Sequence, residues 1–222
     1  MKYKLIIFDF DGTLGDTRAN IIMTMKETLR RKGLPMVSDE SIGATIGLPL
    51  EESFLQLFPD LSEEEMLGCA ALYREIFEEK RRVLIPTLFP GAKETLQALA
   101  EMGCTLSVAS SRRSPSLSSF LNDMGIARYF SYVLGADNVA KAKPDPEPVL
   151  KTLRDLGFSA EETLVVGDMP VDILMGKRAG AAGCGVTYGN SSREELLSSG
   201  ADIIADSLPE LLLSLGVRPG SE

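Results

Sequence analysis

The chain contains no histidine and no tryptophan. The missing histidine excludes a Ser-His-Asp triad, a Cys-His nucleophile pair and a histidine-ligated zinc site. Acid–base chemistry near neutral pH must therefore use carboxylates, lysine, tyrosine, cysteine or a metal-bound water. The cysteines are few, namely Cys69, Cys104 and Cys184. Their odd number and wide spacing predict buried thiols in a reducing compartment.

The sequence also lacks an excess of positive charge. Its 222 residues include 23 Lys and Arg against 32 Asp and Glu, which gives a net charge of −9. Surfaces that bind nucleic acid are basic, so we expect no nucleic-acid partner. An anionic substrate is not excluded, because local charge can oppose the net charge.

Long apolar runs are missing as well. No run approaches the roughly 18 residues that a membrane-spanning helix needs, so we expect no membrane association. The first residues are basic and then apolar, as in a signal peptide, but the apolar run is too short and Asp9 ends it. We expect a cytoplasmic protein.

The order of predicted elements indicates the fold. Short apolar strands alternate with helices from about residue 86 to the end, as in a parallel sheet with helices on both faces. The apolar run 5–10 predicts a further strand of this sheet, whereas residues 16–85 carry helix signals alone. We therefore predict an α/β protein, a Rossmann-like doubly wound parallel sheet with an inserted all-helical cap domain. The predicted boundaries are 1–15 and 86–222 for the core and 16–85 for the cap.

Polar side chains follow several of the predicted strands. Asp9 and Asp11 follow the first strand, and Asp168 and Asp172 follow the strand near residue 165. Ligands of such sheets bind beyond the carboxyl ends of the strands, so we expect these four carboxylates to meet. Carboxylates brought so close repel one another unless a cation lies among them. Oxygen ligands of this kind favour Mg²⁺ together with a substrate phosphate.

Two further positions could bind a phosphate. Ser110 and Ser111 follow another predicted strand, and backbone N–H groups at the start of the next helix could hold phosphate oxygens. Lys143 precedes a further helix and would add a positive charge.

Each motif taken alone also has a purely structural interpretation. Asp11-Gly12 is typical of a hairpin turn, and Ser110-Ser111 of a loop or helix N-cap. Lys143 could be a solvated surface lysine. Asp168 and Asp172 could be an N-cap and a surface carboxylate one helical turn later. The joint occurrence of the motifs, in order and each at a predicted strand end or loop, favours a functional site.

The motifs resemble those of a known family. Asp9-x-Asp11-x-Thr13, Ser110 after an apolar strand, Lys143-Pro144-Asp145-Pro146 and Gly167-Asp168-x-x-x-Asp172 are similar, in this order, to the four motifs of the haloacid dehalogenase superfamily. Two shorter stretches, residues 89–92 and 175–180, resemble its phosphoglycolate-phosphatase-like branch. The helical insertion after the first motif resembles the mobile cap of that branch.

The resemblance implies a role for each matching residue. Asp9 would attack phosphorus and form an aspartyl-phosphate, and Asp11 would protonate the leaving alkoxide and then deprotonate the attacking water. Thr13 would brace the loop. The Mg²⁺ ligands would be Asp9, Asp11 through its main-chain carbonyl, Asp168 and Asp172. The phosphate would be held by Gly12, Ser110, Ser111 and Lys143.

The cap is expected to select the substrate by closing over the site. The positions that we expect to contact substrate are Arg18, Thr45, Gly47, Leu48, Arg112 and Arg113. Beta-phosphoglucomutases of the family carry a histidine in the first cap helix and an arginine after the Gly-Leu turn of the cap. This chain has no histidine, and Pro49 stands where that arginine would be. These departures favour simple hydrolysis over a mutase reaction.

We therefore expect a Mg²⁺-dependent phosphatase that acts on a small phosphorylated metabolite, with 2-phosphoglycolate as the leading named substrate. An inorganic pyrophosphatase, a sugar-phosphate phosphatase and a phosphomutase remain alternatives. Dehalogenation is disfavoured because the dehalogenases lack an acid at the position of Asp11. From other classes, a phospho-accepting receiver-like domain and a non-catalytic binding domain also remain. We expect a monomer or a weak homodimer.

Overall fold

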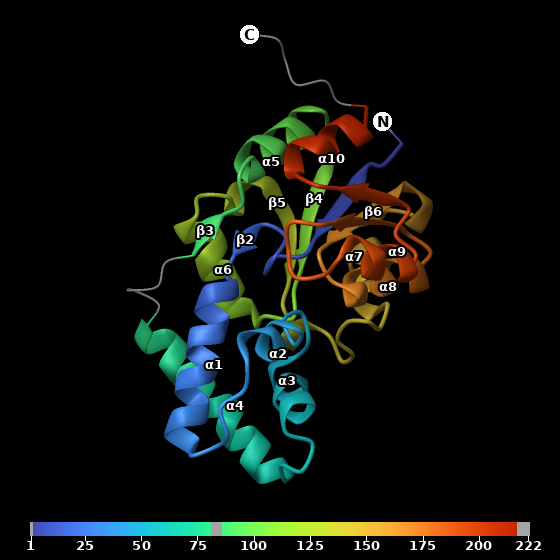
Figure 1. Cartoon of the computed structure of the whole chain (residues 1–222). Coiled ribbons are helices and arrows are strands. Elements are labelled where there is room, and N and C mark those ends of the chain that lie inside the picture. The colour runs from blue at the N-terminus through green and yellow to red at the C-terminus, as the bar shows by residue number, and fades with distance from the viewer. Residues whose placement is uncertain (1, 81–85, 217–222) are drawn as a thin grey trace.

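The computed structural model describes residues 2–80 and 86–216, which form two lobes (Figure 1). The larger lobe is built on a six-stranded sheet in the order β5-β4-β1-β6-β7-β8, with every neighbouring pair parallel. The strands are β1 (Leu5–Phe8), β4 (Thr105–Ala109), β5 (Phe130–Leu134), β6 (Thr163–Gly167), β7 (Ala182–Val186) and β8 (Ile203–Ala205). The sheet confirms the predicted α/β class.

Helices cover both faces of this sheet. They are α5 (Ala92–Glu101), α6 (Ser114–Asp123), α7 (Glu147–Leu156), α8 (Pro170–Arg178), α9 (Arg193–Ser198) and α10 (Leu208–Ser214). The wholly buried strand β1 shows why two layers are needed, because successive side chains point to opposite faces. Ile6 and Phe8 pack with apolar residues of α5, α6 and α10, whereas Leu5 and Ile7 pack with those of α7 and α8.

The smaller lobe holds the helices α1 (Arg18–Lys32), α2 (Asp39–Gly43), α3 (Leu50–Leu57) and α4 (Glu63–Lys80). Helix α1 ends at Gly33, whose φ of 68° is the left-handed conformation that glycine adopts without strain. Helix α4 begins with a capping box, in which the Glu65 amide donates to Ser62 Oγ and the Ser62 amide to the Glu65 carboxylate. This lobe is the predicted all-helical insertion.

The two chain segments that join the lobes lie next to each other. Strand β2 (Gly15–Asp16) leaves the core and β3 (Thr87–Leu88) returns to it, and they pair as a small antiparallel sheet. The predicted domain boundaries at residues 16 and 85 remain a prediction, and residue 85 itself lies outside the described residues.

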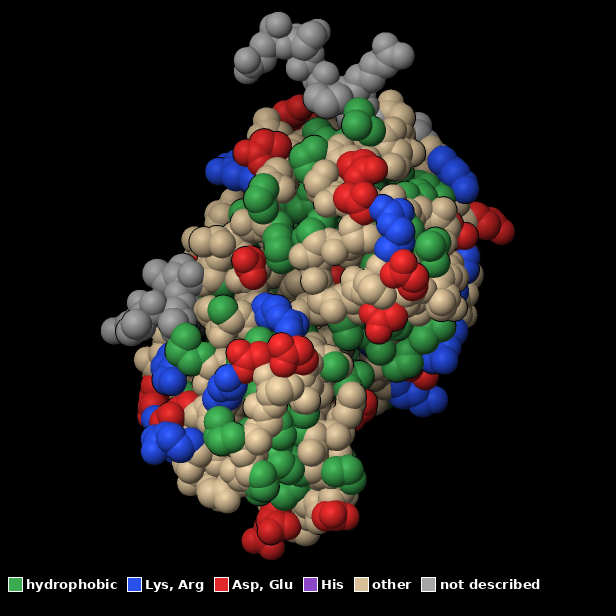
Figure 2. Space-filling view, in the orientation of Figure 1, with side chains coloured by type: hydrophobic (Ala, Val, Ile, Leu, Met, Phe, Trp, Pro, Cys, Tyr) green, Lys and Arg blue, Asp and Glu red, His purple; other side chains and the backbone are tan. Residues whose placement is uncertain are grey.

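Strand order places a ligand site within the core. The chain moves from β1 to β4 and β5 on one side, and then returns to β6, β7 and β8 on the other. Such a reversal opens a crevice at the carboxyl ends of the two central strands, here β1 and β6. Among the described residues, no helix is long and apolar enough to cross a membrane. On the face shown in Figure 2, acidic and basic side chains are interspersed over both lobes.

Candidate active site

The loop after β1 brings Asp9 and Asp11 to this crevice by a tight turn. Gly12 has a φ of +92°, and a Cβ atom there would lie 2.2 Å from Asp168 Oδ2. Only glycine therefore lets the loop approach β6 so closely. The two interpretations of Asp11-Gly12, a turn and part of an acidic site, are compatible, because the turn places the acidic residues at the strand ends.

Three carboxylates, from the loops after β1 and β6 and from the first turn of α8, meet beside one ammonium group. Oxygens of Asp9, Asp168 and Asp172 all lie within 4.8 Å of one another, and all three side chains are buried. Lys143 Nζ donates to Asp9 Oδ1 and to Asp172 Oδ1, both at 2.6 Å. Lys143 is therefore a buried member of the cluster and not a solvated surface lysine.

The electrostatics of the cluster are unbalanced. Burial raises the pKa of Asp9 well above its usual range, despite the nearby charge of Lys143. Burial and then the charge of Asp172 raise the pKa of Asp168 to about 7, against hydrogen bonds from Asn190 and Thr13 that lower it. Three ionised carboxylates and one ammonium would leave two negative charges uncompensated. A divalent cation with a preference for oxygen fits this donor set in charge and in chemistry.

Asp168 is held by partners that the sequence did not connect to it. Thr13, expected to brace its own loop, donates through Oγ1 to Asp168 Oδ1 at 3.0 Å. The backbone amide and Nδ2 of Asn190 both donate to its Oδ2 at 2.8 Å. Tyr188 Oη donates to the Thr13 carbonyl at 2.7 Å and ties the two loops together. Asn190 and Tyr188 follow a different strand, and no spacing in the sequence connects them to Asp168.

Asp11 is placed apart from the three clustered carboxylates. Its two oxygens accept hydrogen bonds from Arg112, from Nη2 at 2.5 Å and from Nε at 3.1 Å. The Arg112 guanidinium also lies over two adjacent rings, 4.9 Å from the centroid of Phe77 in the cap and 4.8 Å from that of Phe120 in the core. Arg112, which we expected to contact substrate, is thus a partner of Asp11. Among the described residues, the Asp11 side chain does not belong to the carboxylate cluster of Asp9, Asp168 and Asp172.

The two serines after β4 have different surroundings. Ser110 is buried, and its Oγ accepts from the Arg112 amide at 3.1 Å. Ser111 Oγ donates to the Gly47 carbonyl in the cap at 2.5 Å. Ser111, expected to bind phosphate, therefore joins the core to the cap in this structure.

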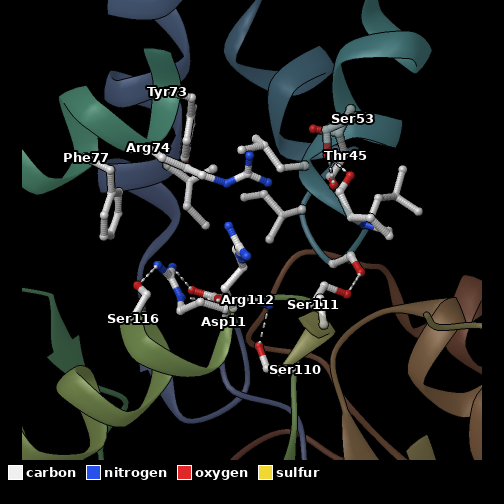
Figure 3. A pocket seen from close by; sticks show the side chains of 18 of the residues that line it. Asp11, Thr45, Ser53, Tyr73, Arg74, Phe77, Ser110, Ser111, Arg112 and Ser116 are labelled. Carbon is white, nitrogen blue, oxygen red and sulfur yellow. Dashed lines mark hydrogen bonds and ion pairs between the residues drawn. The ribbon is translucent and has the colours of Figure 1, made fainter. Parts of the chain in front are cut away.

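A cavity of about 420 Å³ lies between the lobes, and both Asp9 and Asp11 line it (Figure 3). Figure 3 shows Tyr73, Arg74 and Phe77 of α4 across this space from Asp11 and Ser110. The expected contact positions that line the cavity are Thr45, Gly47, Leu48, Arg112 and Arg113. Arg18 is not among the described residues that line it, because its Nη1 donates instead to Asn190 Oδ1 at 2.9 Å.

Comparison with known proteins agrees with this geometry. Residues 6–186 match the model of the haloacid dehalogenase-like hydrolase family. Phosphoglycolate phosphatase of Vibrio parahaemolyticus is 36% identical over 217 residues, which cover 94% of each protein. The Dickeya dadantii protein named "Probable phosphatase IndB" is 39% identical over 210 residues, 94% of this chain and 91% of that protein.

A solved structure is similar over nearly the same extent. It is described as a "predicted phosphoglycolate phosphatase" from Haemophilus somnus and is 28% identical, with a TM-score of 0.85 over 97% of this chain and 99% of that one. The family match spans all four motifs that carry the site. The chain therefore belongs to the haloacid dehalogenase-like hydrolase family.

Proposed function

We propose that this phosphatase hydrolyses small phosphate monoesters in two steps, with Asp9 as the nucleophile. The observation that carries the proposal is the buried group of Asp9, Asp168, Asp172 and Lys143 at the edge of the cavity between the lobes. Asp9 both belongs to this group and lines the cavity, so an ester in the cavity could present its phosphorus to a carboxylate held by Lys143.

The steps follow from the positions of the side chains. An oxygen of Asp9 forms a bond to phosphorus while the bond to the leaving alcohol breaks, and Asp11 gives its proton to the leaving oxygen. Water then attacks the aspartyl-phosphate, Asp11 takes the proton, and phosphate leaves. Both Asp11 oxygens accept hydrogen bonds from Arg112, so Arg112 orients this carboxyl group at the edge of the cavity.

Mg²⁺ is the cation that we propose for the acidic cluster. Asp9, Asp168 and the main chain of Asp11 would hold it, with Asp172 as a supporting carboxylate that also fixes Lys143. When bound, it would neutralise the cluster and polarise a phosphoryl oxygen. Ser110 and Lys143 would hold the remaining phosphoryl oxygens.

The test is turnover of 4-nitrophenyl phosphate with Mg²⁺, with and without EDTA. We expect steady turnover that EDTA abolishes. Asp9→Asn should lower the rate by more than about a thousandfold, because it removes the nucleophile. Asp60→Asn, which removes an exposed cap carboxylate, serves as the matched control and should keep the wild-type rate. An acid-quenched sample should carry phosphate on Asp9 by mass spectrometry. Stoichiometric labelling without turnover would instead indicate a receiver-like domain.

The physiological ester is a separate question. Phosphoglycolate is the first named compound to test, because a relative bears that name and matches almost the whole chain.

A further inference from the structure

We propose that the preferred substrate is a phosphate monoester whose alcohol carries an apolar, ring-sized group. This inference rests on the proposed function and narrows its substrate class. It follows from three properties of the cavity beyond Asp9 and Asp11: its apolar lining, the hydrogen bonds that its polar groups already form, and its volume.

The cap side of the cavity is lined mainly by apolar side chains. The residues are Ile21 and Met25 of α1, Ile46, Leu48 and Pro49 of the loop before α3, Leu50 of α3, and Tyr73 and Phe77 of α4. They come from three cap helices and one loop, so an ester bound at Asp9 would direct its alcohol toward an apolar wall. Aromatic side chains provide large contact areas for flat apolar groups.

Three of the hydroxyl groups that line the cavity already donate to the backbone, and the Tyr73 hydroxyl is a further polar group of this wall. Thr45 Oγ1 donates to the Ile42 carbonyl at 2.8 Å, and Ser53 Oγ lies 3.2 Å from the carbonyls of Thr45 and Pro49. Ser111 Oγ donates to the Gly47 carbonyl. A sugar or glycerol moiety would therefore bury several hydroxyl groups with few donors to meet them, and a buried hydroxyl group without a partner is costly.

Two of the three arginines that line the cavity are engaged, and the third, Arg113, is an exposed residue just before α6. Arg112 forms its two hydrogen bonds with Asp11, and Arg74 Nη2 donates to Glu51 Oε1 at 2.6 Å. A carboxylate on a short alcohol would have to compete with Asp11 for Arg112 or with Glu51 for Arg74, and Arg113 is the remaining lining arginine. Among the described residues, the cap side of the wall lines the cavity with Arg74 as its arginine, so this side matches an uncharged group better than the carboxylate of phosphoglycolate.

The volume of the cavity also favours an alcohol that carries a ring. About 420 Å³ lies in the range of sites that hold ligands of many atoms. A two-carbon alcohol would leave most of that space to water against apolar side chains. A ring would instead bury their surface and its own, which is favourable.

The experiment compares kcat/KM for benzyl phosphate, phosphoglycolate and glycerol 3-phosphate at one Mg²⁺ concentration. All three leaving groups are alkyl alcohols, so none has the activated leaving group of a phenol. Burial of the ring should give benzyl phosphate an advantage of about 10-fold to 100-fold. As an inhibitor, benzylphosphonate should likewise bind more tightly than phosphonoacetate.

A matched pair of variants locates the effect in the wall. Ile21 and Met23 lie on the same helix, but Ile21 lines the cavity and Met23 is 41% exposed. Ile21→Gln should lower the ratio of kcat/KM for benzyl phosphate to that for methyl phosphate by about fivefold or more, because it places an amide against the ring. Met23→Gln should leave this ratio unchanged.

The outcomes separate the two proposals. A preference for benzyl phosphate that Ile21→Gln reduces supports the inference. A preference for phosphoglycolate or glycerol 3-phosphate overturns it and leaves the proposed hydrolysis standing. If neither these esters nor 4-nitrophenyl phosphate is hydrolysed, the proposed function and the inference both fall.

Discussion

Replacing Asp168 by asparagine should make the metal-free protein more stable while removing its response to Mg²⁺. Asp168 is fully buried and lies beside Asp9 and Asp172, so its charge is held in place at a cost when no cation is present. Asparagine has nearly the same shape. Its oxygen can accept from Asn190, and its amide can donate to Thr13, whose hydroxyl group can accept as well as donate.

The size of the effect follows from the pKa of this side chain. Burial and Asp172 raise the pKa of Asp168 from 3.8 to about 7. Since one pKa unit corresponds to about 1.4 kcal/mol, the ionised side chain costs at most about 4 kcal/mol above pH 7. A gain of about 1 to 4 kcal/mol would raise the melting temperature by about 2 to 4 °C per kcal/mol in a chain of this size.

The sign of the pH dependence is also determined. The folded-state pKa lies above the unfolded one, so between pH 3.8 and about 7 the folded state binds more protons. The cost therefore grows as the pH rises through this window and is complete above pH 7. The advantage of Asp168→Asn over wild type should be largest near pH 8 and should shrink as the pH falls toward 4.

Thermal unfolding with EDTA and with Mg²⁺, at pH 8 and pH 5.5, measures these quantities. Mg²⁺ should raise the melting temperature of the wild type and of Asp60→Asn, whose removed carboxylate is exposed. It should have little effect on Asp168→Asn, which should also be inactive. If Asp168→Asn melts below the wild type in EDTA at pH 8, the argument from buried charge is refuted.

Two further substitutions probe the contacts between the lobes. Arg112→Lys loses the paired hydrogen bonds to Asp11 and the stacking on Phe77 and Phe120, so urea denaturation should show a loss of about 1 to 3 kcal/mol. The neighbouring Arg113→Lys is the control, and an equal loss there would contradict the assigned contacts. Ser111→Ala removes the hydrogen bond to the cap at Gly47, worth about 1 kcal/mol, so kcat/KM should fall about fivefold. Ser118→Ala, on the exposed side of α6, should retain the wild-type value, and unchanged kinetics in Ser111→Ala would show that this bond does not assist closure.

The core of the fold could be predicted because its signals are local. Strand β1 is an uninterrupted apolar run, and the glycines after several helices mark where they end. Helix α3 was not predicted. It follows Pro49 without a side-chain hydrogen bond at its N-terminus, so it lacks a capping pair such as the Ser62–Glu65 pair at the start of α4. The two-residue strands β2 and β3 are too short to leave a pattern in the sequence.

In the candidate site too, residues with a local sequence signal could be predicted, and contacts between distant residues could not. Asp9, Asp168, Asp172 and Lys143 could be brought together in prediction because each follows a strand or precedes a helix of one sheet. The partners of Asp11 could not, because the pairing with Arg112 depends on side-chain directions across 101 positions of sequence.

The Arg18 side chain shows most clearly what sequence spacing cannot predict. Its position in the predicted cap suggested a substrate contact, but its hydrogen bond to Asn190 connects α1 to a residue that holds Asp168. Sequence spacing identifies which loops meet, whereas packing decides which atom each long side chain reaches.

The pairing of Gly15–Asp16 with Thr87–Leu88 makes the helical lobe interchangeable in principle. The chain enters the helical lobe at β2 and leaves it at β3, and these two strands pair with each other. A different insert between them could therefore be accommodated without altering any strand pairing of the six-stranded sheet. The carboxylates proposed to be catalytic would keep their places after β1 and β6, while the wall opposite them and the cap contacts of Arg112 and Asn190 would be renewed as a unit. Chimeras joined at this pair of strands could thus transfer the choice of ester from one phosphatase to another.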